Sequence, residues 1–146
     1  MEEAFFEINR VDAIAMDLLT RSAFIIDIHG FCGMSVYTEY AGGKSSYMVD
    51  RLRPLGKLKL AGMVAQGIAD VHSITKESHV SLVHNDINFS NIVVGSRNKP
   101  LLNDFNIAVL QMWNPKKNEV CKFKSHFPNP QVGMPLYQYV LTGERK

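Results

Sequence analysis

Three side chains in the second half of the chain carry oxygen atoms that suit a hard metal ion: Asp86, Asn91 and Asp104. Mg²⁺ prefers oxygen ligands, and both an Asp carboxylate and an Asn carbonyl can supply them. Asp and Asn are also common in surface turns, so three ordinary turn residues are the alternative interpretation. The two interpretations differ in whether the chain brings these side chains to one place.

The residues between Asn91 and Asp104 predict a hairpin. Residues 92–94 (I-V-V) and 101–102 (L-L) are short apolar runs, and residues 95–100 (G-S-R-N-K-P) between them are rich in turn formers. Such a hairpin would fold Asp104 back toward Asn91. The local pattern therefore favours one shared site.

The order of these residues resembles the catalytic segment of protein kinases, which reads H-R-D-x-x-x-x-N and continues, after a hairpin, to D-F-G. In this chain residues 84–86 read H-N-D, Asn91 follows at the same spacing, and residues 104–106 read D-F-N. The resemblance implies that Asp86 accepts the proton of the substrate hydroxyl and that Asn91 assists it at the catalytic site. It also implies that Asn91 and Asp104 hold Mg²⁺ against the phosphates of ATP.

The same resemblance assigns structural roles to two neighbours of the catalytic residues. His84 and Phe105 would pack and set the position of the loop. Asn106 takes the place of the glycine of D-F-G, and we expect it to adopt the positive φ that a glycine allows.

Two stretches upstream have the periodicity of amphipathic helices, one from about Glu3 to Thr20 and one from about Leu58 to Ile74. Two β-rich runs, Phe24–Phe31 and Ser35–Ala41, predict a strand pair between them, and the four prolines after Asn114 predict a long irregular loop. The apolar stripe of the first helix comprises Ile8, Val11, Ala15 and Leu18, with Ile14 and Leu19 beside them. The stripe of the second comprises Leu60, Val64, Gly67, Ile68 and Val71.

The strand pair ends in a segment that resembles the kinase hinge. Thr38 would be the gatekeeper, and the backbone groups of Glu39 and Ala41 would bind the adenine edge of ATP. A plain edge strand is the alternative for this segment. Asp12 takes the position of the helix glutamate that pairs with the catalytic lysine in this family, and a solvated helix acid is its alternative.

Several features depart from the family pattern. No G-x-G-x-x-G occurs, no Lys precedes Ile8, and Asn88 stands where a lysine usually neutralises the transferring phosphoryl group. We therefore expect an incomplete domain with weak or no activity. Its α+β, protein kinase-like two-lobed fold would comprise a small-lobe remnant over residues 1–43 and a partial large lobe over residues 44–146, with the catalytic loop and activation segment.

Composition limits the remaining classes. The formal net charge of +2 is too small for a nucleic-acid binder that works by bulk charge, and no apolar run approaches the roughly 20 residues of a membrane helix. The acidic start and the two cysteines favour a reducing, intracellular and cytoplasmic location. We expect ATP and a protein substrate as partners, and neither nucleic acid nor membrane.

Two other functions share the motif evidence. One is a non-catalytic, kinase-like (pseudokinase) module that binds nucleotide or a partner, which the neutral Asn88 and the absent lysine favour. The other is a small-molecule phosphotransferase of the aminoglycoside or choline kinase type, which shares H-x-D-x-x-x-x-N and a later metal-binding Asp. The Asp-Phe pair at residues 104–105 and the proline-bearing segment after it favour a protein kinase over this second alternative.

Overall fold

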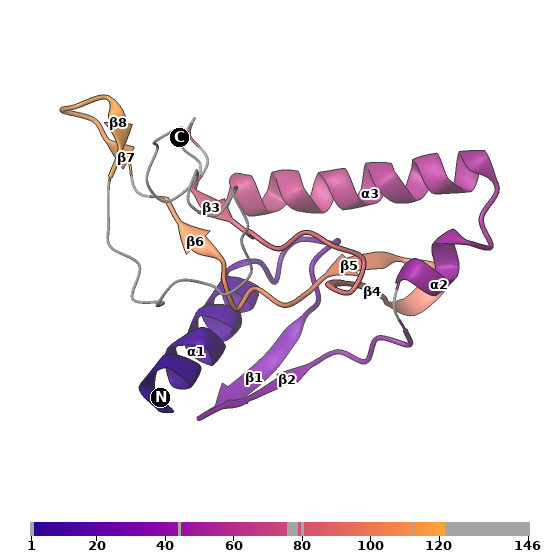
Figure 1. Ribbon diagram of the computed structural model, residues 1–146, viewed down its shortest axis with the longest axis horizontal. Helices are drawn as coiled ribbons and strands as arrows, with labels where there is room; N and C mark the ends of the chain where they lie inside the picture. The colour runs from indigo at the N-terminus through magenta and orange to yellow at the C-terminus, as the bar shows by residue number, and fades with distance from the viewer. Residues whose placement is uncertain (1, 44, 76–78, 80, 112, 122–146) are drawn as a thin grey trace.

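The computed structural model has a mixed α+β fold (Figure 1). It describes residues 2–43, 45–75, 79, 81–111 and 113–121, and within them the chain forms three α-helices and four small two-stranded sheets. The expected α+β class is confirmed at this level. None of the helices in the described part of the chain is both long and apolar enough to cross a membrane.

The first unit consists of helix α1 (Glu2–Leu18) and the antiparallel strands β1 (Ile28–Cys32) and β2 (Ser35–Thr38). Gly33 makes the turn between the strands at φ 59°, a conformation that glycine adopts without strain. Figure 1 shows α1 lying beside this hairpin. The predicted helix and strand pair are confirmed, but both strands are shorter than expected.

The buried face of α1 differs in part from the predicted stripe. Ala15 is buried as expected, whereas Leu18 is 57% exposed, so its predicted place in the core is wrong. Met16, which the predicted stripe did not include, is buried, and so is Leu19, which was expected beside the stripe and directly follows α1. Positions 12, 15, 16 and 19 follow the i, i+3, i+4, i+7 spacing of one helix face, so the face that packs also carries Asp12.

The second unit is dominated by helix α3 (Pro54–His72), which follows the short, unpredicted helix α2 (Ser45–Val49). α3 begins four residues before the predicted start because proline suits the first turn of a helix. Its predicted apolar stripe is buried or half-buried throughout. A Cβ on Gly67 would lie 3.1 Å from Phe24 Cβ, so this glycine lets α3 approach residue 24 closely.

Two further strand pairs surround the motif residues. β4 (Ile92–Val94) and β5 (Pro100–Leu102) form the predicted antiparallel hairpin, closed by a 3₁₀ turn over Ser96–Asn98. β3 (Leu82–Val83) pairs with β6 (Val109–Leu110), which the sequence did not indicate. The β3–β6 pairing brings the residues just before His84 and those just after the D-F-N segment together.

The prediction of an irregular chain after Asn114 is wrong for its first residues. β7 (Trp113–Asn114) and β8 (Glu119–Val120) form a small hairpin. Asn114 Oδ1 accepts hydrogen bonds from the backbone N–H groups of Lys116 and Lys117 at 3.0 and 3.2 Å, which stabilises the turn. The rest of the predicted activation segment, residues 122–146, lies outside the described residues.

One hydrophobic core joins the two parts of the chain. The segment before β1 runs parallel to β5 at Ile25, where Ile26 N–H donates to Leu102 O at 3.0 Å and Leu102 N–H donates to Phe24 O at 2.8 Å. In Figure 1, α3 covers one side of the molecule, and α1 with the β1–β2 hairpin covers the other. The buried core residues are Ala15, Met16, Leu19, Ile25, Ile26, Val71, Leu82, Ile92, Leu101, Leu102 and Phe105.

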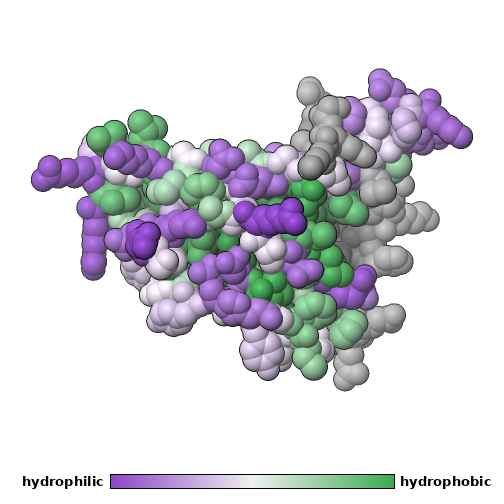
Figure 2. Space-filling view, turned by 180° about the vertical axis from the view of Figure 1, so that it is seen from behind, coloured by the Kyte–Doolittle hydropathy of each residue, from purple (hydrophilic) through white to green (hydrophobic). Residues whose placement is uncertain are grey.

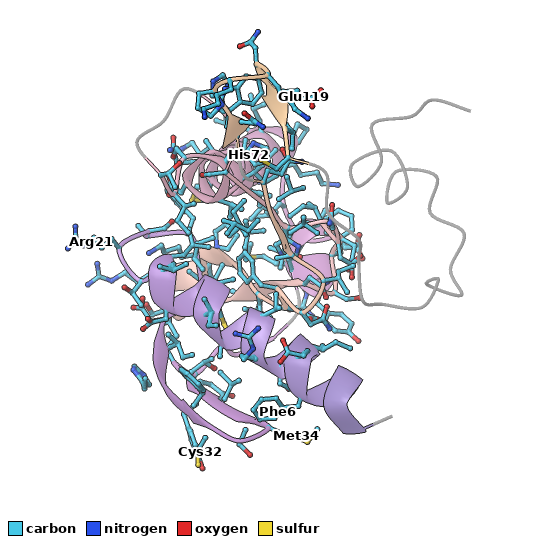
Figure 3. All side chains as sticks on the ribbon, turned by 90° about the vertical axis from the view of Figure 1, so that its left-hand side faces the viewer. Phe6, Arg21, Cys32, Met34, His72 and Glu119 are labelled. Atoms are coloured by element: carbon cyan, nitrogen blue, oxygen red, sulfur yellow. The ribbon has the colours of Figure 1, made fainter. Side chains whose placement is uncertain are left out.

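The opposite face of the molecule is mixed in polarity. Figure 2 shows hydrophobic surface interrupted by hydrophilic side chains. In Figure 3, Phe6 of α1 and Met34 of the β1–β2 turn lie at one end of the molecule, and His72 of α3 and Glu119 of β8 lie toward the other. The D-F-N segment contacts α1 through a hydrogen bond from the Phe105 N–H to Asp12.

Candidate functional site

The predicted hairpin brings the two motif segments into direct contact. The backbone N–H of Asn103 donates to Asn91 O at 2.9 Å, on the continuation of the β4–β5 ladder. The imidazole Nε2 of His84 lies 3.0 Å from Asn103 O. Asn103, the residue directly before Asp104, is therefore bonded to both the beginning and the end of the loop formed by residues 84–91.

Asp86 and Asn91 form the most direct contact between predicted site residues. The amide Nδ2 of Asn91 donates to a carboxylate oxygen of Asp86 at 2.8 Å and to the Asp86 backbone O at 3.0 Å. Asn91 is only 7% exposed, so the loop holds it firmly in this orientation. No described residue donates to its Oδ1 atom, which leaves that oxygen available as a ligand.

Asn88 contacts the same carboxylate from the other side. Its Nδ2 donates to the second oxygen of Asp86 at 2.9 Å, and its own Oδ1 accepts the Ser90 N–H at 2.7 Å. Each carboxylate oxygen of Asp86 thus has one neutral amide donor. Asn88 orients Asp86 but contributes no positive charge.

His84 and Phe105 lie in the core directly beneath the loop. They are 3% and 0% exposed, and their ring centroids are 4.5 Å apart. The Asp86 N–H donates to His84 Nδ1 at 3.3 Å, so a neutral ring that donates from Nε2 to Asn103 O satisfies both contacts. Burial lowers the pKa of His84, while the nearby Asn103 carbonyl and the carboxylates of Asp86 and Asp104 oppose this shift.

The positive φ values in the loop of residues 84–91 and in the D-F-N segment do not occur at Asn106, where one was expected. Asn85 and Asp104 have positive φ values of 67° and 64°. Asn106 is not among the described residues with positive φ, so the expected role of Asn106 is wrong. Asp and Asn adopt the left-handed region more readily than most residues, which explains why Asn85 and Asp104 can adopt this conformation. Asn85 also fixes the loop, because its Nδ2 donates to Ile107 O at 3.2 Å.

Asp12 of α1 reaches the same place from the other part of the chain. Its Oδ1 accepts a hydrogen bond from the backbone N–H of Phe105 at 2.6 Å. Burial is the main cause of a raised pKa for Asp12; the carboxylate of Asp104 raises it further, and the hydrogen bond from Phe105 opposes both. A solvated helix acid therefore does not describe Asp12, whose partner is a backbone amide.

The predicted hinge lies at the end of β2 and is fixed mainly by its backbone. The Thr38 hydroxyl donates to Glu39 O at 3.2 Å, and Glu39 exchanges two hydrogen bonds with the backbone of Asp27 at 2.8 and 3.1 Å. Two further bonds, Gly42 N–H to Val94 O at 2.9 Å and Val94 N–H to Gly43 O at 2.8 Å, attach the chain to β4. The backbone of Ala41, between these two anchors, makes no hydrogen bond to another described residue.

The structure therefore joins most of the predicted site residues and leaves the hinge separate. Hydrogen bonds or ring contacts connect Asp12, His84, Asp86, Asn91 and Phe105 into one network, in which Asp104 precedes Phe105. Within the described ranges, no hydrogen bond links residues 38–41 to residues 84–91 or 103–105. Sequence reasoning missed Asn103, whose only signal was its position directly before Asp104.

Comparison with known proteins assigns no family to the chain: no protein-family model matches it, and no curated protein matches it. Among the described residues there is also no group of three or more His, Cys, Asp or Glu side chains that could hold a metal ion. A metal at this site would be held by one carboxylate, that of Asp104, and one amide oxygen, that of Asn91.

Proposed function

We propose that the chain carries the catalytic centre of a protein kinase-like phosphotransferase, a two-lobed fold in which ATP phosphorylates a protein hydroxyl. In this proposal Asp86 accepts the hydroxyl proton, Asn91 and Asp104 bind Mg²⁺, and residues 38–41 bind adenine. Phosphoryl transfer depends mostly on positioning and charge, so the arrangement of these side chains is the relevant evidence.

A single observation carries the proposal: Asn91 Nδ2 contacts the Asp86 carboxylate at 2.8 Å while Asn91 O accepts the Asn103 N–H at 2.9 Å. The first contact orients the carboxylate that would accept a proton. The second brings the residue before Asp104 to the same loop. Ordinary surface turns require neither contact, so the geometry favours the site over the turn interpretation.

The residues present fit a hard divalent cation. The amide nitrogen of Asn91 donates to Asp86, and no described residue donates to its Oδ1. Because Asn91 is only 7% exposed, this oxygen is held in a fixed position. A carboxylate and an amide oxygen, completed by phosphate and water oxygens, are a common ligand set for Mg²⁺. When bound, Mg²⁺ neutralises charge on the transferring phosphoryl group.

The hinge also fits its proposed role through the backbone rather than through side chains. No described residue bonds to the backbone N–H or carbonyl of Ala41, which lies between two anchored stretches, at Glu39 and at Gly42–Gly43. An adenine edge needs one donor and one acceptor in fixed positions. The anchors on both sides hold these groups in place.

A second candidate function, a kinase-like module that binds Mg·ATP without turnover, is favoured by Asn88. This neutral amide contacts Asp86 Oδ1 at 2.9 Å, where the family places a lysine. Without that charge, stabilisation of the transition state would be weaker while binding of the metal and nucleotide would be retained.

Assays of the full chain with radiolabelled Mg·ATP distinguish these functions. We expect phosphate transfer to a panel of hydroxyl-bearing peptides to be weak at most, and any transfer should fall about 100-fold or more in Asp86→Asn and be lost in Asp104→Asn. Asp17→Asn, on the exposed face of α1, is the matched control.

Two outcomes would assign the other functions. Thermal stabilisation by Mg·ATP without transfer would assign the binding module, with about 2.7 kcal/mol expected at 100 times Kd. Transfer to small alcohols but not to peptides would assign a small-molecule phosphotransferase. Neither binding nor transfer would reject the proposed function.

A further inference from the structure

The contact between Asp12 and Phe105 joins residues separated by 93 positions in the chain. Its length of 2.6 Å is short for an N–H···O hydrogen bond, and Phe105 is fully buried. It connects a side chain of α1 directly to the backbone of the D-F-N segment. A contact of this kind constrains the backbone on which Asp104 is carried.

The constraint acts at the turn that carries Asp104. Asp104 has φ 64°, a conformation that costs energy for a residue with a side chain. Before it, Asn103 is fixed by Asn91 and His84; after it, Phe105 N–H is fixed by Asp12, and Phe105 O accepts the Ala108 N–H at 2.9 Å. The direction of the Asp104 side chain therefore depends on both flanking anchors.

Asp12 reaches this turn because of how α1 packs. Ala15, Met16 and Leu19 on the same helix face are at most 4% exposed, so the second half of α1 is held rigidly in the core. Phe6, at the other end of α1, is 45% exposed, and Figure 3 shows it at the end of the molecule beside Met34. The inner half of the helix is thus the part that can position another segment.

We propose that Asp12 is a positioning residue, which holds the turn at Asp104 and Phe105 in its metal-binding conformation by accepting the Phe105 N–H. The effect of Asp12 on a metal site rests on the proposed function, whereas its hydrogen bond to the turn does not. It differs from the pairing with lysine that the resemblance implies, because the partner is a backbone donor that every residue at position 105 except proline would provide. Asp12 binds neither metal nor substrate in this arrangement.

Amide hydrogen exchange of the full chain tests the hold on the turn without any ligand. In Asp12→Ala the Phe105 amide should exchange about 10-fold faster or more, since the lost hydrogen bond is one to a charged group. Asp12→Asn keeps an acceptor oxygen and should retain most of the protection. Asp17→Ala, which removes an exposed carboxylate from the same helix, should change nothing at residue 105.

Binding of Mn²⁺ alone, measured by titration, tests the consequence for the metal site. We expect Asp12→Ala to weaken binding about 10-fold, as other residues that orient metal ligands do, and Asp12→Asn to weaken it less. Asp104→Ala should abolish binding. If the unmodified chain binds no Mn²⁺, the proposed function fails, while the exchange data still decide whether Asp12 holds the turn.

If Asp12→Ala does not fold, hydrogen exchange of the unmodified protein tests the same contact. As denaturant is added below the global transition, the Phe105 amide and the amides of Ala15 and Met16 should lose protection together, because one opening of α1 would release them all. Phe105 protection that survives the opening of α1 would overturn the proposal. So would unchanged exchange at Phe105 in a folded Asp12→Ala variant.

Discussion

The predicted catalytic loop, residues 84–91, and the predicted hinge, residues 38–41, are built in different ways. In the loop, side chains make the contacts: Asn91 and Asn88 hold Asp86, and His84 holds Asn103. In residues 38–43, which comprise the predicted hinge and the two glycines after it, the backbone makes most of them, and the Tyr40 side chain is 89% exposed. The loop therefore depends on residue identity, whereas the hinge depends mainly on the path of the chain.

This difference explains why the two regions give sequence signals of unequal strength. A contact that needs an Asn amide or an imidazole restricts the residue type, so it leaves a recognisable pattern. A contact through N–H and C=O groups can be made by almost any residue. Substitutions should accordingly have large effects in the loop and small effects in the hinge, and the following experiments test that ranking.

The largest effect is expected for Phe105→Ala. Phe105 is 0% exposed and packs on His84, so its truncation leaves a cavity and should lower the free energy of unfolding by about 3–5 kcal/mol. Phe89→Ala is the matched control, because Phe89 is 56% exposed and should change stability by about 0.5 kcal/mol or less. Denaturant titration measures both, and equal effects would contradict the packing described for Phe105.

The next effect is expected for Asn91→Ala, at about 1–3 kcal/mol of unfolding free energy. This change removes both amide hydrogen bonds to Asp86 within a buried part of the loop. Asn88→Ala also removes a contact to Asp86, but Asn88 is exposed and water can replace it. A larger loss for Asn88→Ala than for Asn91→Ala would reverse the roles assigned to the two amides.

The stability of the loop should also depend on pH through His84. Burial lowers the pKa of His84 in the folded state, so the folded chain binds fewer protons than the unfolded chain, in which histidine titrates near about 6.5. Stability should therefore fall as the pH decreases below about 6.5 and continue to fall until the pH reaches the folded pKa. Thermal unfolding at a series of pH values measures this loss.

His84→Gln should flatten that dependence, and an unchanged slope would show that His84 is not its source. Asp12 acts with the opposite sign, because its raised pKa means that the folded chain binds protons more readily. Its contribution to stability increases as the pH falls through its folded pKa toward the unfolded value of about 3.9. Asp12→Asn, which removes this contribution and keeps an acceptor, separates the two.

The smallest effect is expected in the hinge. Glu39→Ala removes one exposed hydrogen bond, from Asp27 N–H to Oε1 at 3.1 Å, and should cost about 0.5–1 kcal/mol. Tyr40→Ala should be close to neutral. If Glu39→Ala destabilised the chain as much as Asn91→Ala, the contrast between the two regions would be wrong.

The sequence allowed the prediction of those elements that have a strong local pattern. Both long helices and the β4–β5 hairpin follow from apolar spacing and turn residues. The β3–β6 pair was missed because it contains two residues on each side and is formed by a contact across the chain. Leu18 was misplaced because Leu18 and Leu19 are both apolar, and the sequence does not show which of the two faces the rest of the protein. The orientation of the helix decides that Leu19 is buried and Leu18 is exposed.

The site residues were predicted from motif spacing, and their connections were not. Nothing in the sequence indicates that Asp12 meets the Phe105 N–H or that Asn103 joins His84 to Asn91. Backbone partners carry no residue signature, so these contacts require the three-dimensional arrangement. The same limit applies to the positive φ at Asp104, which was expected two residues later at Asn106.

The parallel contact between Ile25 and Leu102 has a consequence for the order of folding. Neither α1 nor the segment after it can complete its core until β5 has been synthesised and paired, because Leu102 bonds to both Phe24 and Ile26. During translation the apolar face of α1 therefore stays exposed until β5, which lies far along the chain, has been synthesised. Such long-range closure slows folding and exposes apolar surface to aggregation. We expect nascent chains that end before residue 100 to be bound by chaperones more than nascent chains that extend past β5.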